Sequence, residues 1–407
     1  MVKMLVLMSV AAIVLAASSA KAQDAAGRFV QDRFAIGFWV DPPAEEITDA
    51  RYKEIADANF TFVLGAFGPQ SVKDVQKQLA LCEKYGLKAI VKSNLTKPED
   101  LPDSPACWGY HIVDEPSTAS FAELRTVVDT IRKNRPGKLA YINLLPDYAN
   151  AAQLGAPTYD EYVSGFCKET GCDVLCMDYY PMLTPNADGR DGYCGNLKVM
   201  RKYSLKYKIP FWNFFNTMPF GPHYDPTESH LRWQVYTSLA YGAKGVLYFC
   251  YWTPRGGEFP KGGAIITDAG ERTRHYDQAK RINAAVKNLG PTLMRLTSLK
   301  VIRIKAADDP ASALERSPIK SISKGGDYLV GVFKHYDGRR AVLLNNYDHN
   351  YTSWPTVEFD VPDDQVIEVD QSSGKERPVR DDSPDMPGLQ TSLDAGEGRL
   401  FLLPAKR

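Results

Sequence analysis

The 407-residue sequence lacks an excess of charge of either sign, because 49 Lys and Arg residues balance 49 Asp and Glu residues. A nucleic-acid-binding protein usually carries a basic excess, and an anionic membrane surface attracts basic segments, so we expect neither partner. The chain has only six His and no CxxC or HExxH motif. Metal-ligand spacing is therefore absent, and we expect no metal and no other cofactor.

Long apolar runs are also scarce, and the one at the N-terminus is typical of a secretory signal. Lys3 precedes an apolar run over 5–17, which is too short to span a bilayer, and Ala20-Lys21-Ala22 fits a small-x-small cleavage site. We predict a signal peptide over 1–22, a mature chain from Gln23, secreted or periplasmic localisation and no membrane insertion. Oligomeric state stays open.

Seven cysteines follow this signal. Export permits disulfides, and Cys167 with Cys172 or Cys82 with Cys107 are possible pairs, but spacing alone does not decide the pairing.

From residue 34 onward, apolar strand-like segments alternate with amphipathic helical patterns. The last helix is expected from about Arg272 to Asn288, ending at Gly290-Pro291. This alternation predicts a (β/α)₈ TIM barrel over 23–292. An open doubly wound sheet is the alternative, but it usually shows a glycine-rich first turn, which is absent here. Turn-separated strands after Pro291 predict a small all-β sandwich over 293–407. The expected barrel strands are 34–40, 60–67, 87–93, 107–115, 139–145, 173–180, 210–216 and 245–252.

The fourth of these segments has the most informative end, since CWGYHIVDEP closes on two adjacent carboxylates, Asp114 and Glu115. Pro116 then stops the strand, because proline has no N–H to donate. Charge at the end of an apolar strand is costly unless it has a use. Because barrel sites lie at the C-terminal ends of strands, this end predicts the site.

The other strand ends carry carboxylates, amides and aromatics rather than cations. Such a set suits uncharged, hydroxyl-rich ligands better than phosphates. We therefore predict a carbohydrate substrate, with Trp39 and Trp252 stacking on sugar faces and polar groups binding hydroxyls. Ordinary core packing or capping is the alternative for each of these side chains. The predicted substrate-binding residues are Trp39, His111, Asn143, Tyr180, Asn216, Trp252 and Glu258.

Glycoside hydrolysis requires two carboxyl groups that flank the scissile bond. Glu115 is our candidate for the protonated general acid, and Asp178, at the end of the sixth strand, for the second, ionised group. A helix cap or an ion pair is the alternative role for each. A carboxyl separation of about 5 Å would indicate a retaining enzyme, and one of about 6.5–9.5 Å an inverting enzyme.

Four segments, GYHIVDEP, DYYP, LAYGAKGVLYFCYW and AIITDAGERTRHYDQAKRIN, resemble secreted bacterial TIM-barrel glycoside hydrolases of the β-galactosidase-like clan. The resemblance implies that Glu115 is the acid/base, preceded by Asp114 where the clan usually has Asn. It also implies a nucleophilic Glu at the end of strand seven, where this chain has Asn216, and a strained peptide after Trp252.

The missing strand-seven acid leaves two mechanisms open. In the first, Asp178 replaces it. In the second, the Asp114-Glu115 pair resembles substrate-assisted hexosaminidases, in which Asp114 would orient an acetamido group and Tyr180 would assist. Glu258, in a glycine-rich loop, is a further candidate carboxylate. The competing functions are a catalytically inactive carbohydrate-binding barrel and a structural envelope protein.

Overall fold

The computed structural model describes residues 27–184, 187–256, 259 and 263–406. Its first part contains eight parallel strands in two four-stranded sheets, with the orders β1-β8-β7-β6 and β2-β3-β4-β5. The eight predicted strands are therefore all present. They are β1 (Ala35–Phe38), β2 (Phe62–Gly65), β3 (Lys88–Lys92), β4 (Cys107–Asp114), β5 (Leu139–Asn143), β6 (Leu175–Asp178), β7 (Phe211–Asn216) and β8 (Gly245–Phe249).

Backbone hydrogen bonds join the two sheets at both pairs of edges. Between β1 and β2, the Thr61 N–H donates to the Ile36 carbonyl at 2.9 Å. Between β5 and β6, the Leu144 N–H donates to the Cys176 carbonyl at 2.9 Å, and Leu144 pairs with Met177 in parallel. All eight strands consequently point their C-terminal ends toward one face.

Helices follow most of the strands, as predicted, and only a short 3₁₀ turn, η2 (Pro98–Asp100), separates β3 from β4. The last helix runs past its predicted end. It continues through Pro291 to Leu293, because a proline in the last turn removes only one backbone hydrogen bond. The helices are α2 (Asp49–Asp57), α3 (Val72–Lys84), α4 (Phe121–Asn134), α5 (Ala151–Leu154), α6 (Tyr159–Thr170), α7 (Arg190–Tyr207), α8 (Glu228–Tyr241) and α9 (Arg274–Leu293).

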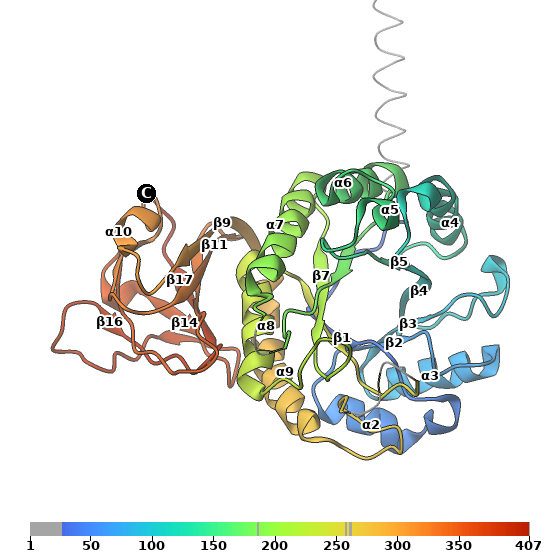
Figure 1. Ribbon diagram of the computed structural model, residues 1–407. Helices are drawn as coiled ribbons and strands as arrows, with labels where there is room; N and C mark the ends of the chain where they lie inside the picture. Colours follow the sequence, from blue (N-terminus) through green and yellow to red (C-terminus); the bar gives the residue numbers. More distant parts are fainter. Residues whose placement is uncertain (1–26, 185–186, 257–258, 260–262, 407) are drawn as a thin grey trace, which may run out of the picture.

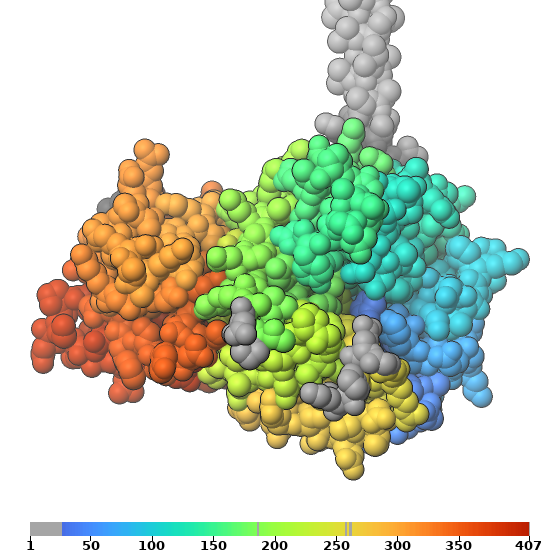
Figure 2. All heavy atoms as spheres, viewed as in Figure 1, coloured from blue at the N-terminus to red at the C-terminus, as the bar shows by residue number. Residues whose placement is uncertain are grey.

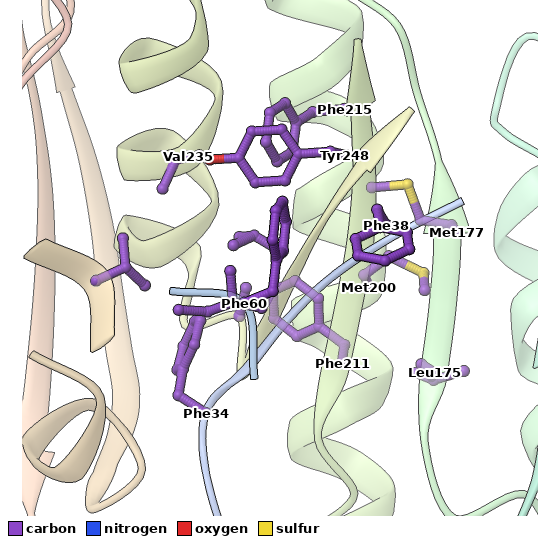
Figure 3. Packing of buried hydrophobic residues seen from close by; sticks show 14 of the residues in the cluster. Phe34, Phe38, Phe60, Leu175, Met177, Met200, Phe211, Phe215, Val235 and Tyr248 are labelled. Atoms are coloured by element: carbon purple, nitrogen blue, oxygen red, sulfur yellow. The ribbon is translucent and has the colours of Figure 1, made fainter. Parts of the chain in front are cut away.

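Apolar side chains between the strands and the helices form the largest core. Figure 3 shows aromatic residues of β1, β7 and β8, among them Phe38, Phe215 and Tyr248, packed beside Val235 of α8. A second cluster lies among the strands themselves and includes Phe62, Trp108 and Trp212. The strands are thus buried on both faces, which explains why they read as continuous apolar runs rather than alternating ones.

The C-terminal part is all-β, as predicted. A six-stranded antiparallel sheet, β15-β14-β17-β12-β11-β9, and a three-stranded sheet, β10-β13-β16, share a core of their own. Its elements are β9 (Leu296–Ile304), α10 (Pro310–Ala313), β10 (Ile319–Ile322), β11 (Tyr328–His335), β12 (Arg340–Asn346), β13 (Thr356–Phe359), β14 (Ile367–Val369), β15 (Glu376–Pro378), β16 (Leu389–Gln390) and β17 (Gly398–Leu403).

The other face of the six-stranded sheet packs on α8, where Phe333 and Leu343 join the core of the first part. Figure 1 shows this domain, in orange and red, beside α7 and α8, and Figure 2 shows it as the smaller of two lobes. The sheet therefore covers the outside of the helices, away from the open ends of the parallel strands.

Two observations bear on export. No helix within the described ranges is both long and apolar enough to cross a bilayer. All seven cysteines are free thiols in this structure, so neither possible pair is joined. The predicted signal peptide lies outside the described residues.

The pairing of β4 with β5, which carries the predicted site, depends on Gly109. A Cβ at this position would lie 2.1 Å from the Leu139 carbonyl oxygen, so β5 would have to move. We expect Gly109→Ala to lower the free energy of unfolding by about 1–3 kcal/mol. Urea denaturation measures this change.

Gly165→Ala is the matched control, because a Cβ there lies 3.6 Å from its nearest neighbour, the Phe121 ring, within a helix. It should be neutral or stabilising by about 0.5–1 kcal/mol. Equal denaturation midpoints for Gly109→Ala and the wild type would contradict the proposed close contact.

Candidate active site

The C-terminal end of β4 presents two carboxylates in an unusual backbone geometry. Asp114 is the last residue of the strand, and Glu115 follows with φ +50°, a left-handed conformation that is uncommon for a residue with a side chain. The Glu115 N–H donates to the Asn143 carbonyl at 2.9 Å, so β5 holds this turn. The result is that Asp114 and Glu115 both reach the surface at the same strand end.

The Asn143 amide connects three strands at this point. Its Nδ2 donates to Asp114 Oδ1 and to Asp178 Oδ1, each at 3.1 Å, and its side chain is only 3% exposed. Asn143, Asp114 and Asp178 are the last residues of β5, β4 and β6. The ends of three neighbouring strands therefore meet at this amide. Asn143, predicted to bind a sugar hydroxyl, instead holds two carboxylates together, and its buried Oδ1 has no partner among the described residues.

Burial raises the pKa values of all three carboxyl groups. Burial, then the charges of Glu115 and Asp114, raise the pKa of Asp178 well above its ordinary value, against the opposing effect of the Asn143 hydrogen bond. Burial and the nearby Asp114 raise the pKa of Glu115, whereas a hydrogen bond from Asp178 lowers it. Burial also raises the pKa of Asp114. Asp178, the most deeply buried at 6% exposure, therefore favours its protonated form, whereas the sequence predicts it to be the ionised group.

A side-chain hydrogen bond from Asp178 contributes to the pKa of Glu115, so the two carboxyl groups are neighbours where β4 and β6 end. Retaining pairs lie about 5–5.5 Å apart and inverting pairs about 6.5–9.5 Å. Which of the two classes this pair belongs to stays a prediction.

Aromatic rings border the carboxylates. The Tyr180 ring lies beside Asp178, whose charge contributes to the raised pKa of the Tyr180 phenol, and contacts Phe249 at a centroid distance of 5.0 Å. Trp39, at the end of β1, is partly exposed and contacts Phe67 and Phe214 edge-on, at 4.9 and 5.3 Å. Tyr180 and Trp39 are therefore each packed against other aromatic rings at the strand ends.

His111 packs against one of these rings. Its ring lies 5.6 Å from the Trp39 ring, and its buried Nε2 has no hydrogen-bond partner among the described residues. Burial and the nearby charge of Lys92 lower the pKa of His111 to about 4. The imidazole is consequently neutral at physiological pH and offers an unused polar atom near the site.

Two predicted site residues, Asn216 and Trp252, have other roles in the structure. Asn216 is fully buried; its Oδ1 accepts from the Met182 N–H and its Nδ2 donates to the Met218 carbonyl, so the backbone already occupies this amide. Trp252 belongs to the core between the strands and the helices, and the Arg51 guanidinium carbon lies 5.0 Å from the centroid of the Trp252 ring. The unusual peptide near Trp252 is a cis bond, and it lies before Cys250 rather than after Trp252. Glu258 is outside the described residues.

Two residues that sequence reasoning missed follow β5. Burial raises the pKa of Asp147 to about 6, and Tyr148 is 58% exposed while its phenol lies near Asp178 and Glu115. The only sequence signal is the Pro146-Asp147-Tyr148 turn after a strand, which is too common a pattern to indicate a site.

A cavity of about 910 Å³ lies at the opposite end of the strands, lined by residues such as Asp173, Phe211 and Lys244, which precede or begin β6, β7 and β8. Two of its charged groups are hydrogen-bonded within the fold: Lys244 Nζ donates to the Leu296 carbonyl at 2.7 Å, and Asp173 accepts from Arg28 at 2.6 Å. Among the described residues, no group of three or more His, Cys, Asp or Glu could hold a metal ion. The strand C-terminal ends therefore remain the candidate active site.

Solved structures share this fold. They include a catalytic mutant of a GH42 β-galactosidase from G. stearothermophilus, with TM-score 0.63, 9% identity, and coverage of 92% of this chain and 98% of that one. A β-galactosidase from Bacillus circulans has TM-score 0.58, 10% identity, and coverage of 91% and 99%. A family 39 glycoside hydrolase from Bacteroides cellulosilyticus has TM-score 0.52, 14% identity, and coverage of 91% and 81%.

No protein-family model and no curated protein matches the sequence. At identities this low, the structural likeness shows a common fold that extends over both domains.

The raised pKa of Asp178 predicts a pH-dependent effect on stability. Because its folded-state pKa lies above the unfolded value, the contribution of Asp178 to stability falls as pH rises through that folded pKa. We expect Asp178→Asn to be more stable than the wild type at about pH 8, with a smaller gain at about pH 5; each pKa unit corresponds to about 1.4 kcal/mol. Urea denaturation at both pH values measures the difference.

Asp173→Asn is the control, since Asp173 is equally buried but accepts from Arg28, Arg132 and the Phe29 N–H. Breaking this pairing should destabilise the protein by about 3 kcal/mol or more. A loss of stability in Asp178→Asn that is the same at both pH values would show that Asp178 is not held protonated.

Proposed function

We propose that the protein is a glycoside hydrolase that cleaves an O-glycosidic bond in an oligo- or polysaccharide, with Glu115 as general acid/base. The observation that carries this proposal is that Asn143 brings Asp114, Glu115 and Asp178 together at the ends of parallel strands, beside aromatic rings. Carboxyl groups with raised pKa values are the proton donors that glycosidic cleavage requires.

In the proposed reaction, Glu115 gives its proton to the glycosidic oxygen as the bond from that oxygen to the anomeric carbon breaks. Glu115 is the surface-exposed member of the pair, so it can reach a substrate, whereas Asp178 is buried. Asp178 is then the second carboxylate in the sense that its hydrogen bond holds Glu115 in position. Water finally supplies the oxygen at the anomeric carbon and returns a proton to Glu115.

The attacking group comes from the other side of the sugar ring. Because Asp178 is buried, we favour water or a substituent of the substrate itself over Asp178 as the attacking group. Substrate assistance, the second mechanism that the sequence left open, gives Asp114 a role, since Asn143 orients its carboxylate. Tyr180, next to Asp178, would assist this step.

The proposed substrate is an uncharged carbohydrate. Within the described residues, no Lys or Arg forms an ion pair with Asp114, Glu115 or Asp178, and Lys92 lies near His111 instead, so the three carboxyl groups would repel an acidic sugar. Trp39 offers a partly exposed ring for stacking, and His111 an unused polar atom for a hydroxyl.

We also propose that the two parallel sheets form one closed (β/α)₈ barrel, supported by the hydrogen bonds at both pairs of sheet edges. The domain boundaries proposed from the sequence, 23–292 and 293–407, separate this barrel from a β-sandwich that stiffens its helices. Cleavage after residue 22 and export complete the proposal, and they rest on the sequence alone.

A second candidate function is carbohydrate binding without catalysis. It is favoured by the end of β7, where a fully buried and hydrogen-bonded Asn216 occupies the position of the clan nucleophile. Wild-type protein that binds glycans in calorimetry but releases no product from them would support this alternative.

Glu115→Gln tests the proposed acid. It keeps the size of the side chain but removes the transferable proton, so we expect hydrolysis to fall by about 10²–10⁴-fold. The assay measures reducing-sugar release from a panel of soluble polysaccharides and release of 4-nitrophenol from aryl glycosides.

Glu123→Gln is the matched control, because Glu123 is an exposed residue of α4, a helix that packs outside the strands. It should retain wild-type activity and stability. Full activity of Glu115→Gln on a glycan that the wild type cleaves would exclude Glu115 as the acid.

A further inference from the structure

Tyr148 is an exposed aromatic side chain beside the carboxylates. It follows β5 by five residues and is 58% exposed, whereas Asn143 and Asp178, at the ends of β5 and β6, are buried. Among the other exposed aromatic residues that the structure describes, Phe67 follows β2 and is 40% exposed, and Tyr336, Tyr351 and Trp354 belong to the C-terminal domain. Tyr148 is therefore the most exposed aromatic residue in the described part of the parallel-strand domain.

The Tyr148 ring has a firm support. It contacts the Tyr179 ring edge-on at a centroid distance of 5.2 Å, and Tyr179 directly follows Asp178. Tyr179 contacts Tyr193 at 5.9 Å, and its hydroxyl lies against Gly192, where a Cβ would be only 1.9 Å away. This close packing holds Tyr179 in place, so the ring that it supports is pre-positioned for binding.

The exposed ring adjoins the reacting groups. Its contact with the ring of Tyr179, the residue after Asp178, places Tyr148 where β6 ends. Burial, then the charges of Asp178 and Glu115, raise the pKa of the Tyr148 phenol, so the phenol stays neutral. An accessible, neutral aromatic face next to a proton donor matches the apolar C–H face of a sugar ring.

We propose that Tyr148 is a substrate-binding residue that forms a stacking platform for the uncharged sugar unit adjoining the scissile bond. This inference rests on the proposed glycosidase function. Binding depends on the ring face and not on the hydroxyl, because no hydrogen bond from the Tyr148 hydroxyl supports the surrounding fold within the described residues.

Three variants test the platform: Tyr148→Ala removes the ring, Tyr148→Phe keeps it, and Tyr351→Ala removes another exposed tyrosine, which belongs to the C-terminal domain. On the polysaccharide that the wild type hydrolyses best, Tyr148→Ala should raise KM about five- to tenfold and change kcat less than about threefold. Tyr148→Phe and Tyr351→Ala should retain the wild-type KM. A KM for Tyr148→Ala within about twofold of wild type, or a Phe variant no better than Ala, would overturn the inference.

Binding distinguishes this inference from the proposed function. Calorimetry measures the affinity of two proteins, Glu115→Gln and the double variant Glu115→Gln/Tyr148→Ala. The ligands are short β-linked oligosaccharides of glucose, of galactose and of N-acetylglucosamine. Turnover by the wild type with a KM independent of Tyr148 refutes the platform alone. Binding that depends on Tyr148, without any wild-type turnover, refutes the hydrolase and retains the platform. If the wild type shows no turnover and the Glu115→Gln protein binds none of the oligosaccharides, both the hydrolase and the platform are refuted.

Discussion

The arrangement of the site depends on one amide that holds two carboxylates of neighbouring strands. Asn143 donates to Asp114 and Asp178 at the same distance, 3.1 Å, and its own carbonyl accepts from the Glu115 N–H. Asn143 thereby fixes the side chains of Asp114 and Asp178 and the backbone of Glu115. Carboxylates repel one another when ionised, so without this neutral donor between them they would separate.

The buried acids at the two ends of β6 show that the charge at the site is not an accident of packing. Asp173, just before the strand, accepts from two arginines and a backbone N–H. Asp178, five residues later and just as deeply buried, receives only the Asn143 amide and the charges of two further acids. The arginines that pair with Asp173 show that this fold can neutralise a buried carboxylate, and it has no such partner for Asp178 among the described residues. Keeping Asp178 partly protonated lowers stability, which is a cost that active sites commonly carry.

The sequence predicts well what depends on a single strand. The apolar runs that end in Asp114, Glu115 and Asp178 locate these acids, because a parallel strand places its last residues at one face whatever its neighbours are. The sequence does not predict which way a side chain points from the end of a strand. From the sequence, Trp39 and Trp252 are equally good candidates for stacking on a sugar, because each follows a strand. In the structure, Trp39 borders the site, whereas Trp252 faces the helices and lies against Arg51.

Contacts between segments that are distant in sequence account for the other differences. The hydrogen bond between the carboxyl groups of Glu115 and Asp178 depends on the left-handed turn at Glu115, and no local signal marks that turn. Tyr148 lies in a Pro-Asp turn of an ordinary kind, and only the Gly192–Tyr179 packing shows why its ring stays at the site.

The end of β7 shows how the fold accommodates the loss of an expected acid. Asn216 accepts from the Met182 N–H and donates to the Met218 carbonyl, so it fixes the segment that continues from Asp178 through Tyr180 to Met182. A carboxylate could accept from Met182, but it could not donate to Met218, and burying its charge would be costly. Asn therefore suits this position better than Glu once the position supports strand six. The chemistry of the site would then rest on β4 and β6, while β7 maintains the position of the segment that carries Asp178.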